Sequence, residues 1–121
     1  MSNSSTDPRP MDASTSSARI ALTTFASIEE ARRMGRTLVE ERLAACATLL
    51  PAVESIYHWQ GAVESAHETM LLIKTAAEKL PALEARLLAL HSYSTPEFLV
   101  LPVESGSEAY LAWLQASIGP G

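Results

Sequence analysis

The fold is decided by residues 46–75, which read CATLLPAVESIYHWQGAVESAHETMLLIKT. Apart from Pro51 and Gly61, this stretch predicts two long strands, residues 47–60 and 62–75. Gln60 and Gly61 fit a tight turn, because glycine adopts the positive φ that hairpin turns need. Pro51 lacks a backbone N–H, so it predicts a bulge or an edge position in the first strand. The stretch therefore predicts one long β-hairpin.

A strand and a helix are predicted before the hairpin. Residues 19–24, RIALTT, form a short apolar run typical of a strand. The sequence SIEE at residues 27–30 matches a capping box, in which Glu30 reaches back to the backbone of Ser27. A helical stripe that would face a sheet follows at Ala31, Met34 and Leu38. We expect this helix to end around residues 43–45.

The segment after the hairpin predicts a helix, a strand and a second helix. A helical stripe is formed by Leu80, Leu83, Leu87 and Leu90, with Pro81 acceptable in the first turn. Residues 98–103, FLVLPV, predict a buried strand, and Ser107 caps the last helix. The order is β-α-β-β-α-β-α. It predicts an α+β fold of the split-βαβ, ferredoxin-like plan with one extra C-terminal helix.

The predicted hairpin is longer than the domain that carries it. Its strands of about 14 residues, at roughly 3.3 Å each, extend ~45 Å. A compact domain of about 100 residues has a radius of gyration of about 13 Å and so a diameter of ~34 Å. The hairpin should overhang its own domain and expose Tyr57, Trp59 and strand edges, which another copy of the chain would cover. The alternative is a hairpin that bends at Pro51 and folds back over one domain.

Composition separates a tail from a single domain. Residues 1–17 hold six Ser, two Thr and two Pro, and they bury too little apolar surface to offset the entropy of ordering. We predict a flexible tail over residues 1–17 and one domain over residues 18–121. The chain has 121 residues, enough for one core.

Charge and cysteine content exclude several classes of protein. The net charge of −5 argues against nucleic-acid binding. We read Arg32, Arg33 and Arg36, which stand among glutamates, as a solvated helix face with pairs such as Glu29–Arg33 and not as a phosphate-binding patch. A single cysteine favours a reducing compartment. No apolar run approaches the ~20 residues of a membrane span, and no secretory signal is visible. We expect a cytoplasmic protein without membrane or nucleic-acid partners.

Catalytic signatures are missing from the sequence. It contains no G-x-S-x-G, no glycine-rich phosphate loop and no H-E-x-x-H. Cys46 follows Leu43, Ala44 and Ala45 in an apolar stretch, which is typical of a small core residue and not of a nucleophile. The sequence therefore favours a binding module over an enzyme.

Metal ligands are present but scattered. The imidazoles are His58, His67 and His91, and no two candidate ligands have the spacing of a metal site, so any site must assemble in three dimensions. His91 is the best candidate because it ends a helix beside Tyr93 and Glu97. The alternative for each histidine is a surface or structurally hydrogen-bonded role.

Lys74 follows an apolar run, Met-Leu-Leu-Ile, in a strand that we expect to be largely buried. A buried ammonium needs a partner, and Glu97, at the head of another strand, is the better candidate than Glu68. The alternative is a lysine that extends to water at the strand end.

Taken in order and spacing, these segments resemble the CutA divalent-cation tolerance family over about residues 20–118. The resemblance rests on ERLAACA at 41–47, YHWQG at 57–61, Glu68 with LIKT at 72–75, HSYSTPE at 91–97 with LVLPV at 99–103, and YLAWL at 110–114. It implies a cytoplasmic homotrimer of ferredoxin-like subunits whose long hairpins pair across subunits. It also implies tolerance of copper and other divalent metals with no established catalytic step.

The resemblance further implies a cleft between subunits. Its residues map onto Cys46, Tyr57, Trp59, Glu68, Lys74, His91, Tyr93 and Glu97. We take His91, Glu97 and Cys46 as the ligands of copper or another divalent metal. Some relatives carry Cys where this chain has Thr23, and a second His where it has Leu90. Ser92 replaces a usual proline.

Two other functions remain open. The first is a trimeric signalling module that binds a small anionic ligand, with Lys74 as the contact, or a partner protein. The second is an enzyme that uses Glu68, Lys74 and Glu97 in a cleft between subunits.

Overall fold

The computed structural model describes residues 16–119. Its elements follow the predicted order: β2 (Ala18–Phe25), α1 (Ile28–Glu40), β3 (Cys46–Trp59), β4 (Ala62–Ala76), a 3-10 turn (Ala77–Lys79), α2 (Leu80–Leu90), β5 (Leu99–Pro102) and α3 (Glu108–Ile118). None of the helices in residues 16–119 has both the length and the apolar character that crossing a bilayer requires.

Most of the predicted tail, residues 1–15, lies outside the described residues, as do residues 120–121. Its last two residues contact the domain. Ser16 Oγ donates a hydrogen bond to the carbonyl of Val103 at 2.8 Å. The backbone N–H of Ala77 donates to the carbonyl of Ser17 at 2.7 Å. These two bonds hold the start of the described chain against the sheet.

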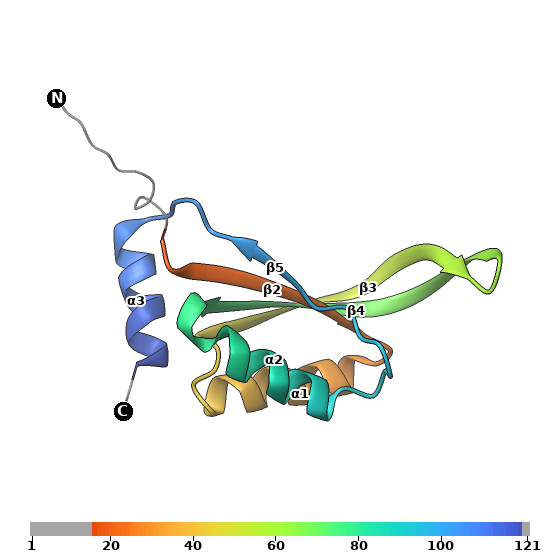
Figure 1. Ribbon diagram of the computed structural model, residues 1–121, viewed down its shortest axis with the longest axis horizontal. Coiled ribbons are helices and arrows are strands. Elements are labelled where there is room, and N and C mark those ends of the chain that lie inside the picture. The colour runs from red at the N-terminus through yellow and green to blue at the C-terminus, as the bar shows by residue number, and fades with distance from the viewer. Residues whose placement is uncertain (1–15, 120–121) are drawn as a thin grey trace, which may run out of the picture.

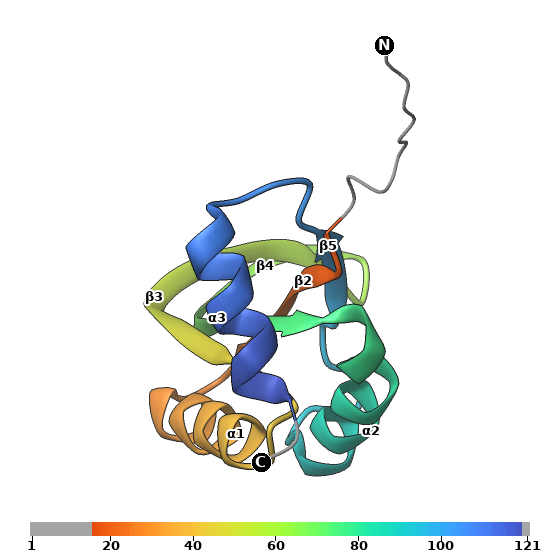
Figure 2. The same ribbon diagram turned by 90° about the vertical axis from the view of Figure 1, so that its left-hand side faces the viewer.

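The four strands form one antiparallel sheet in the order β3-β4-β2-β5. Helices α1 and α2 lie side by side under one face, and α3 lies across the end of the sheet (Figures 1 and 2). The side chains of Ala21, Leu71 and Ile73 are buried on the face that α1 and α2 cover. Alternate residues lie on the other face, which we call the open face: Ile20, Leu22, Leu50, Leu72, Lys74, Leu99 and Leu101.

The hairpin of β3 and β4 forms as predicted, within one residue at each end. Gln60 and Gly61 have φ values of 50° and 84°, so the two-residue turn is of the kind whose twist matches the strands. The register shifts between Leu50 and Val53, where Pro51 and Ala52 form the predicted bulge. Beyond the bulge the hairpin extends away from the rest of the domain (Figure 1).

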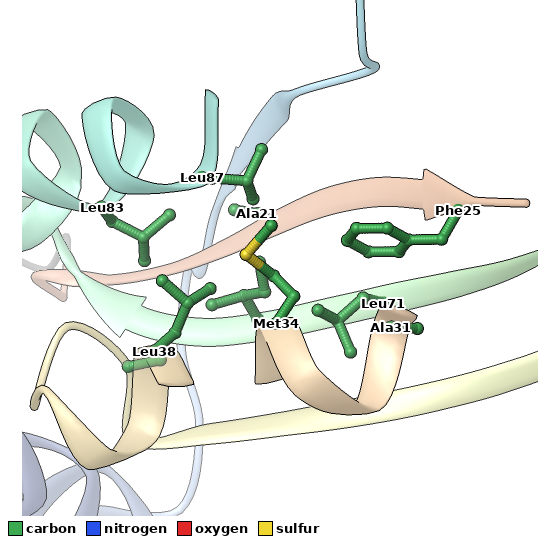
Figure 3. Close-up of a cluster of buried hydrophobic side chains, with 10 residues drawn as sticks. Ala21, Phe25, Ala31, Met34, Leu38, Leu71, Leu83 and Leu87 are labelled. Atoms are coloured by element: carbon green, nitrogen blue, oxygen red, sulfur yellow. The ribbon is translucent and has the colours of Figure 1, made fainter. Parts of the chain in front are cut away.

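The core lies between α1, α2 and the sheet. Ala31, Met34 and Leu38 of α1 are buried, as the stripe predicts, and they pack with Leu83 and Leu87 of α2 (Figure 3). Burial of a leucine or methionine side chain contributes about 1.5–3 kcal/mol. Gly35 lets α1 approach β3 closely, because a Cβ at residue 35 would lie 3.1 Å from the Cβ of Ala47.

Two predictions about α1 are wrong. The helix ends at Glu40 and not around residues 43–45. Arg42 takes a left-handed φ of 59°, and the N–H groups of Leu43 and Ala44 fold back to the Leu38 carbonyl, which closes the helix. Ser27 caps the helix by accepting from the N–H of Glu30, but the Glu30 carboxylate accepts from Ser92 and does not return to Ser27. The Glu30 carboxylate thus binds Ser92, which is distant in the sequence, instead of the nearby backbone of Ser27.

A strand forms within residues 98–103, as predicted, but the prediction that this strand is buried is wrong. All four residues of β5 are exposed, because β5 is an edge strand and half of its side chains lie on the open face. Leu90, the last residue of its predicted stripe, is exposed as well. The apolar residues of β5 and the end of α2 therefore remain exposed in the single chain.

Candidate functional site

The predicted site residues separate into two clusters. The tyrosine cluster contains Ser55, Glu68, His91 and Tyr93. The lysine cluster contains Cys46, Thr48 and Lys74. Along β4 the first cluster lies at Glu68, the partner of Val53, and the second at Lys74, the partner of Cys46. Six residues of strand separate these positions, which corresponds to about 20 Å.

Glu68 joins the hairpin to the loop after α2. Its Oε1 accepts a hydrogen bond from Ser55 Oγ at 2.7 Å, and its Oε2 accepts one from Tyr93 Oη at 2.8 Å. Burial, followed by the hydrogen bond to Glu68 and its negative charge, raises the pKa of Tyr93 to about 12. Tyr93 therefore stays protonated at neutral pH and remains a donor to the carboxylate.

His91 sits at the end of α2, as predicted, and both of its ring nitrogens have protein partners. Nε2 lies 2.8 Å from the carbonyl oxygen of Thr24, so Nε2 carries the proton. Nδ1 accepts from the backbone N–H of Tyr93 at 3.0 Å. The ring is buried and stacks on Phe25 with centroids 4.4 Å apart. This is the structurally hydrogen-bonded alternative for His91, since a metal ion at either nitrogen would displace a protein partner.

The loop after α2 is fixed to α1 by Glu30. The backbone N–H and the hydroxyl of Ser92 donate to the two oxygens of Glu30 at 2.9 and 2.8 Å. Sequence reasoning missed Ser55, Thr24 and the Glu30–Ser92 contact. For Glu30 the local capping pattern suggested another partner, and for Ser55 and Thr24 no local signal exists.

In the lysine cluster, Lys74 lies beside β3. Its Nζ donates to Thr48 Oγ1 at 2.8 Å and lies 3.8 Å from Cys46 Sγ. The predicted pairing of Lys74 with Glu97 is wrong, because β4 has β3 and β2 as neighbours, and Glu97 precedes β5 on the far side of β2. Cys46 is half-buried on the open face instead of inside the core.

The sequence and the fold agree with known proteins. The family model of the CutA1 divalent ion tolerance protein matches residues 19–117. The chain belongs to the CutA1 family. The divalent-cation tolerance protein CutA of Thermus thermophilus is 45% identical over 100 residues, which cover 83% of this chain and 97% of that protein. The Pectobacterium atrosepticum protein of the same name is 48% identical over 88 residues, covering 73% and 80%.

Solved CutA structures share the fold. CutA of Xylella fastidiosa superposes with a TM-score of 0.83 at 41% identity, covering 86% of this chain and 100% of that one. The Archaeoglobus fulgidus structure, described as a periplasmic divalent cation tolerance protein CutA, gives 0.81 at 33% identity, covering 84% and 99%. An α+β fold with a four-stranded antiparallel sheet and three helices is therefore shared with CutA proteins.

The predicted metal ligands of this CutA family member do not meet within one chain. Cys46 belongs to the lysine cluster and His91 to the tyrosine cluster, while Glu97 lies half-buried before β5. In residues 16–119, no group of three or more His, Cys, Asp or Glu side chains is arranged to hold a metal ion. A site with all three ligands would need more than one subunit.

The remaining cleft residues of this CutA chain, Tyr57 and Trp59, lie on the overhanging part of the hairpin. Trp59 is 60% exposed, and Ile56 and Val63, on the opposite face of the hairpin, are 70% and 66% exposed. Both faces of the hairpin tip thus present apolar side chains to solvent in the single chain.

Proposed function

We propose that this divalent-cation tolerance protein acts as a homotrimeric binding or regulatory module, not as an enzyme, and that it responds to copper or another divalent metal in a cleft between subunits. The observation that carries the proposal is the apolar surface that one chain leaves uncovered next to the lysine cluster.

The open face supports the assembly. Leu99 and Leu101 are 57% and 47% exposed, and they continue the apolar surface of Leu22 and Leu72. Within the described residues, β3 and β5 each pair with one strand only. Exposed apolar faces and free strand edges promote association. Three copies with a ferredoxin-like sheet, joined through the long hairpins, would cover both.

The lysine cluster supports a site at the same interface. Cys46 is half-buried on the open face, where a second copy would lie, and its thiol suits a soft ion such as Cu(I). His91 has both ring nitrogens in hydrogen bonds with the protein, so it could bind metal only by giving up one of them. Among the described residues, the Cys46 thiol has only two contacts, each at 3.8 Å, with Thr48 Oγ1 and Lys74 Nζ. Lys74 would give up its contact with the sulfur.

The test combines mass and metal binding on the metal-free protein. Light scattering should give the mass of a trimer. Cu(I) under reducing conditions, Cu(II) and Zn(II) should raise the melting temperature in a saturable manner. Cys46→Ser should weaken the copper response at least about tenfold, as loss of one ligand predicts, while His58→Ala on the hairpin should not. An unchanged response in Cys46→Ser would refute the site, and a monomer would refute the assembly.

A second candidate function is a trimeric signalling module for a small anionic ligand or a partner protein. It is favoured by Lys74, whose ammonium donates to the Thr48 hydroxyl and has no carboxylate within 4.0 Å among the described residues. Lys74→Met should abolish stabilisation by such an anion, and retention of the effect would remove Lys74 from the site. Both functions assume a cytoplasmic protein, which cell fractionation tests.

A further inference from the structure

A groove of about 440 Å³ lies between α1 and the edge strand β3. It is lined by Arg32, Gly35, Arg36, Val39, Glu40 and Ala47, none of which belongs to the tyrosine or the lysine cluster. We propose that this groove binds the phosphate group of a small organic phosphate between the guanidinium groups of Arg32 and Arg36. The site is separate from the metal site of the proposed function, and it borders the β3 edge that the proposed assembly would pair.

The two arginines are the first reason. Arg32 and Arg36 stand one helical turn apart on α1, so their Cβ atoms lie about 5–6 Å from each other and both side chains can reach one tetrahedral group. Like charges at this spacing destabilise a helix slightly. A bound dianion would remove that repulsion and would offer each guanidinium paired acceptor oxygens.

The second reason is that, among the described residues, Arg32 and Arg36 have no hydrogen-bond or carboxylate partner, unlike Arg42 and Arg86. Arg86 forms a bidentate ion pair with Glu41, and Arg42 donates to the carbonyl of Ser117. Within residues 16–119, neither Arg32 nor Arg36 lies within 4.0 Å of a carboxylate. The predicted Glu29–Arg33 ion pair is likewise not formed at that distance. The solvated face of paired charges that the sequence suggests is therefore not what α1 presents.

The third reason is the shape of the groove. Its floor is made by Gly35 and Ala47, and a Cβ on residue 35 would lie only 3.1 Å from the Cβ of Ala47. Gly35 and Ala47 have little or no side chain, and the exposed side chains of Arg32 and Arg36 also line the groove. A volume of this size exceeds what inorganic phosphate needs and lies in the range of small-ligand sites, roughly 300–1,000 Å³. Val39 and Ala47 give the organic part of the ligand an apolar contact.

Substitution of Glu40 should increase the affinity for phosphate instead of lowering it. It lines the groove one turn beyond Arg36, and its negative charge opposes an incoming phosphate. Replacing it with the isosteric glutamine should tighten binding. A gain in affinity cannot arise from misfolding, so this variant keeps the proposal testable even where an arginine variant loses stability.

The experiment measures affinity for phenyl phosphate and inorganic phosphate by calorimetry at constant ionic strength and neutral pH. Phenyl phosphate should bind saturably and more tightly than inorganic phosphate. Arg32→Gln and Arg36→Gln should each weaken binding about tenfold or more, as expected for a charge-assisted hydrogen bond. Glu40→Gln should strengthen it about threefold, the size of a surface charge effect. Arg33→Gln, which removes the same charge from the same helix but lines a different hollow, should change it little.

Four results would overturn the proposal. Absence of saturable binding to the wild-type chain is the first, and equal losses in Arg33→Gln and Arg36→Gln, which would indicate charge attraction alone, are the second. Equal affinity for benzoate would reject a phosphate site. Loss of binding in Lys74→Met would move the anion to the lysine cluster. Copper titration of Arg36→Gln keeps the two proposals distinct, because the metal response should remain as in the wild type.

Discussion

The two faces of the sheet are built from the same strands but differ in what a single chain does with them. On β4, Leu71 and Ile73 are completely buried under α1 and α2, whereas Leu72 and Lys74, their immediate neighbours, are only half-buried on the open face. One face thus completes a core within the chain. The other is apolar and, within the described residues, α3 covers it only around Ala18 and Ala76.

The largest expected effect comes from breaking the covered face. Leu71→Ala should lower the free energy of unfolding by about 2–5 kcal/mol, because it removes buried methyl groups and leaves a cavity between α1 and the sheet. Denaturant titration measures this loss. A cost below about 1 kcal/mol would mean that the helices do not pack on the sheet as the structure has them.

A charge on the open face should break assembly and leave the fold intact. Leu101→Asp would place a carboxylate in the proposed subunit interface, with an expected loss of about 2 kcal/mol or more in association. Light scattering should then show monomers, and circular dichroism should show unchanged secondary structure.

Leu88→Asp is the matched control for that variant. Leu88 lies on α2 and is 46% exposed in the single chain, almost the same as the 47% of Leu101. If the open face is the interface, Leu88→Asp keeps the mass of a trimer. Dissociation of both variants would show that exposure alone, and not the face, decides the outcome.

The comparison also explains what the sequence could and could not predict. The order of elements, the Ser27 cap, the turn at Gln60 and Gly61 and the bulge at Pro51 all follow from local chemistry, and all are confirmed. The burial of β5 was mispredicted because an apolar run indicates that a surface will be covered, but not whether the same chain or another copy covers it. Strand neighbours are likewise non-local, which is why Lys74 was assigned the wrong partner.

The same limit applies to the candidate site. His91, Tyr93 and Glu68 were each named from the sequence, and the structure brings them together in one cluster. Beyond the cluster, His91 bonds to Thr24 of β2 at a sequence separation of 67 residues, and Glu68 bonds to Ser55 of β3 at a separation of 13 residues. The neighbouring Ser92 bonds to Glu30 of α1 at a separation of 62 residues. No local pattern encodes such contacts. Sequence reasoning could therefore find the polar residues but not the bonds that occupy them.

The tyrosine cluster should contribute an intermediate amount to the free energy of unfolding, and this contribution should depend on pH. Tyr93→Phe removes the hydrogen bond to the Glu68 carboxylate, which should cost about 1.5–3 kcal/mol. The folded pKa of Tyr93, about 12, lies above its ordinary value of 10.0. The folded state therefore holds a proton that the unfolded state has lost, so this contribution is complete below pH 10 and disappears as the pH rises through 12.

Ultraviolet titration of the folded protein tests that assignment. A phenolate step near pH 12 should be present in the wild type and absent in Tyr93→Phe. Tyr110→Phe, on α3, should keep the step and the stability. If the step survives in Tyr93→Phe, another tyrosine carries it and the Glu68 contact is not formed in solution.

The smallest expected effects come from two buried threonines on the face of the sheet that α1 and α2 cover. Thr23 and Thr75 are both completely buried there, but their hydroxyls differ. Thr75 Oγ1 donates to the carbonyl of Leu43 at 2.7 Å, whereas Thr23 Oγ1 has no hydrogen-bond partner among the described residues.

A buried hydroxyl without a partner keeps its desolvation cost, so Thr23→Val should raise the free energy of unfolding by about 0.5–1 kcal/mol. Thr75→Val should lower it by about 1–2 kcal/mol, because it also leaves the Leu43 carbonyl without its donor. Opposite signs for two substitutions of the same kind, measured by denaturant titration, would separate packing from hydrogen bonding, and a loss in both variants would mean that Thr23 has a partner in solution.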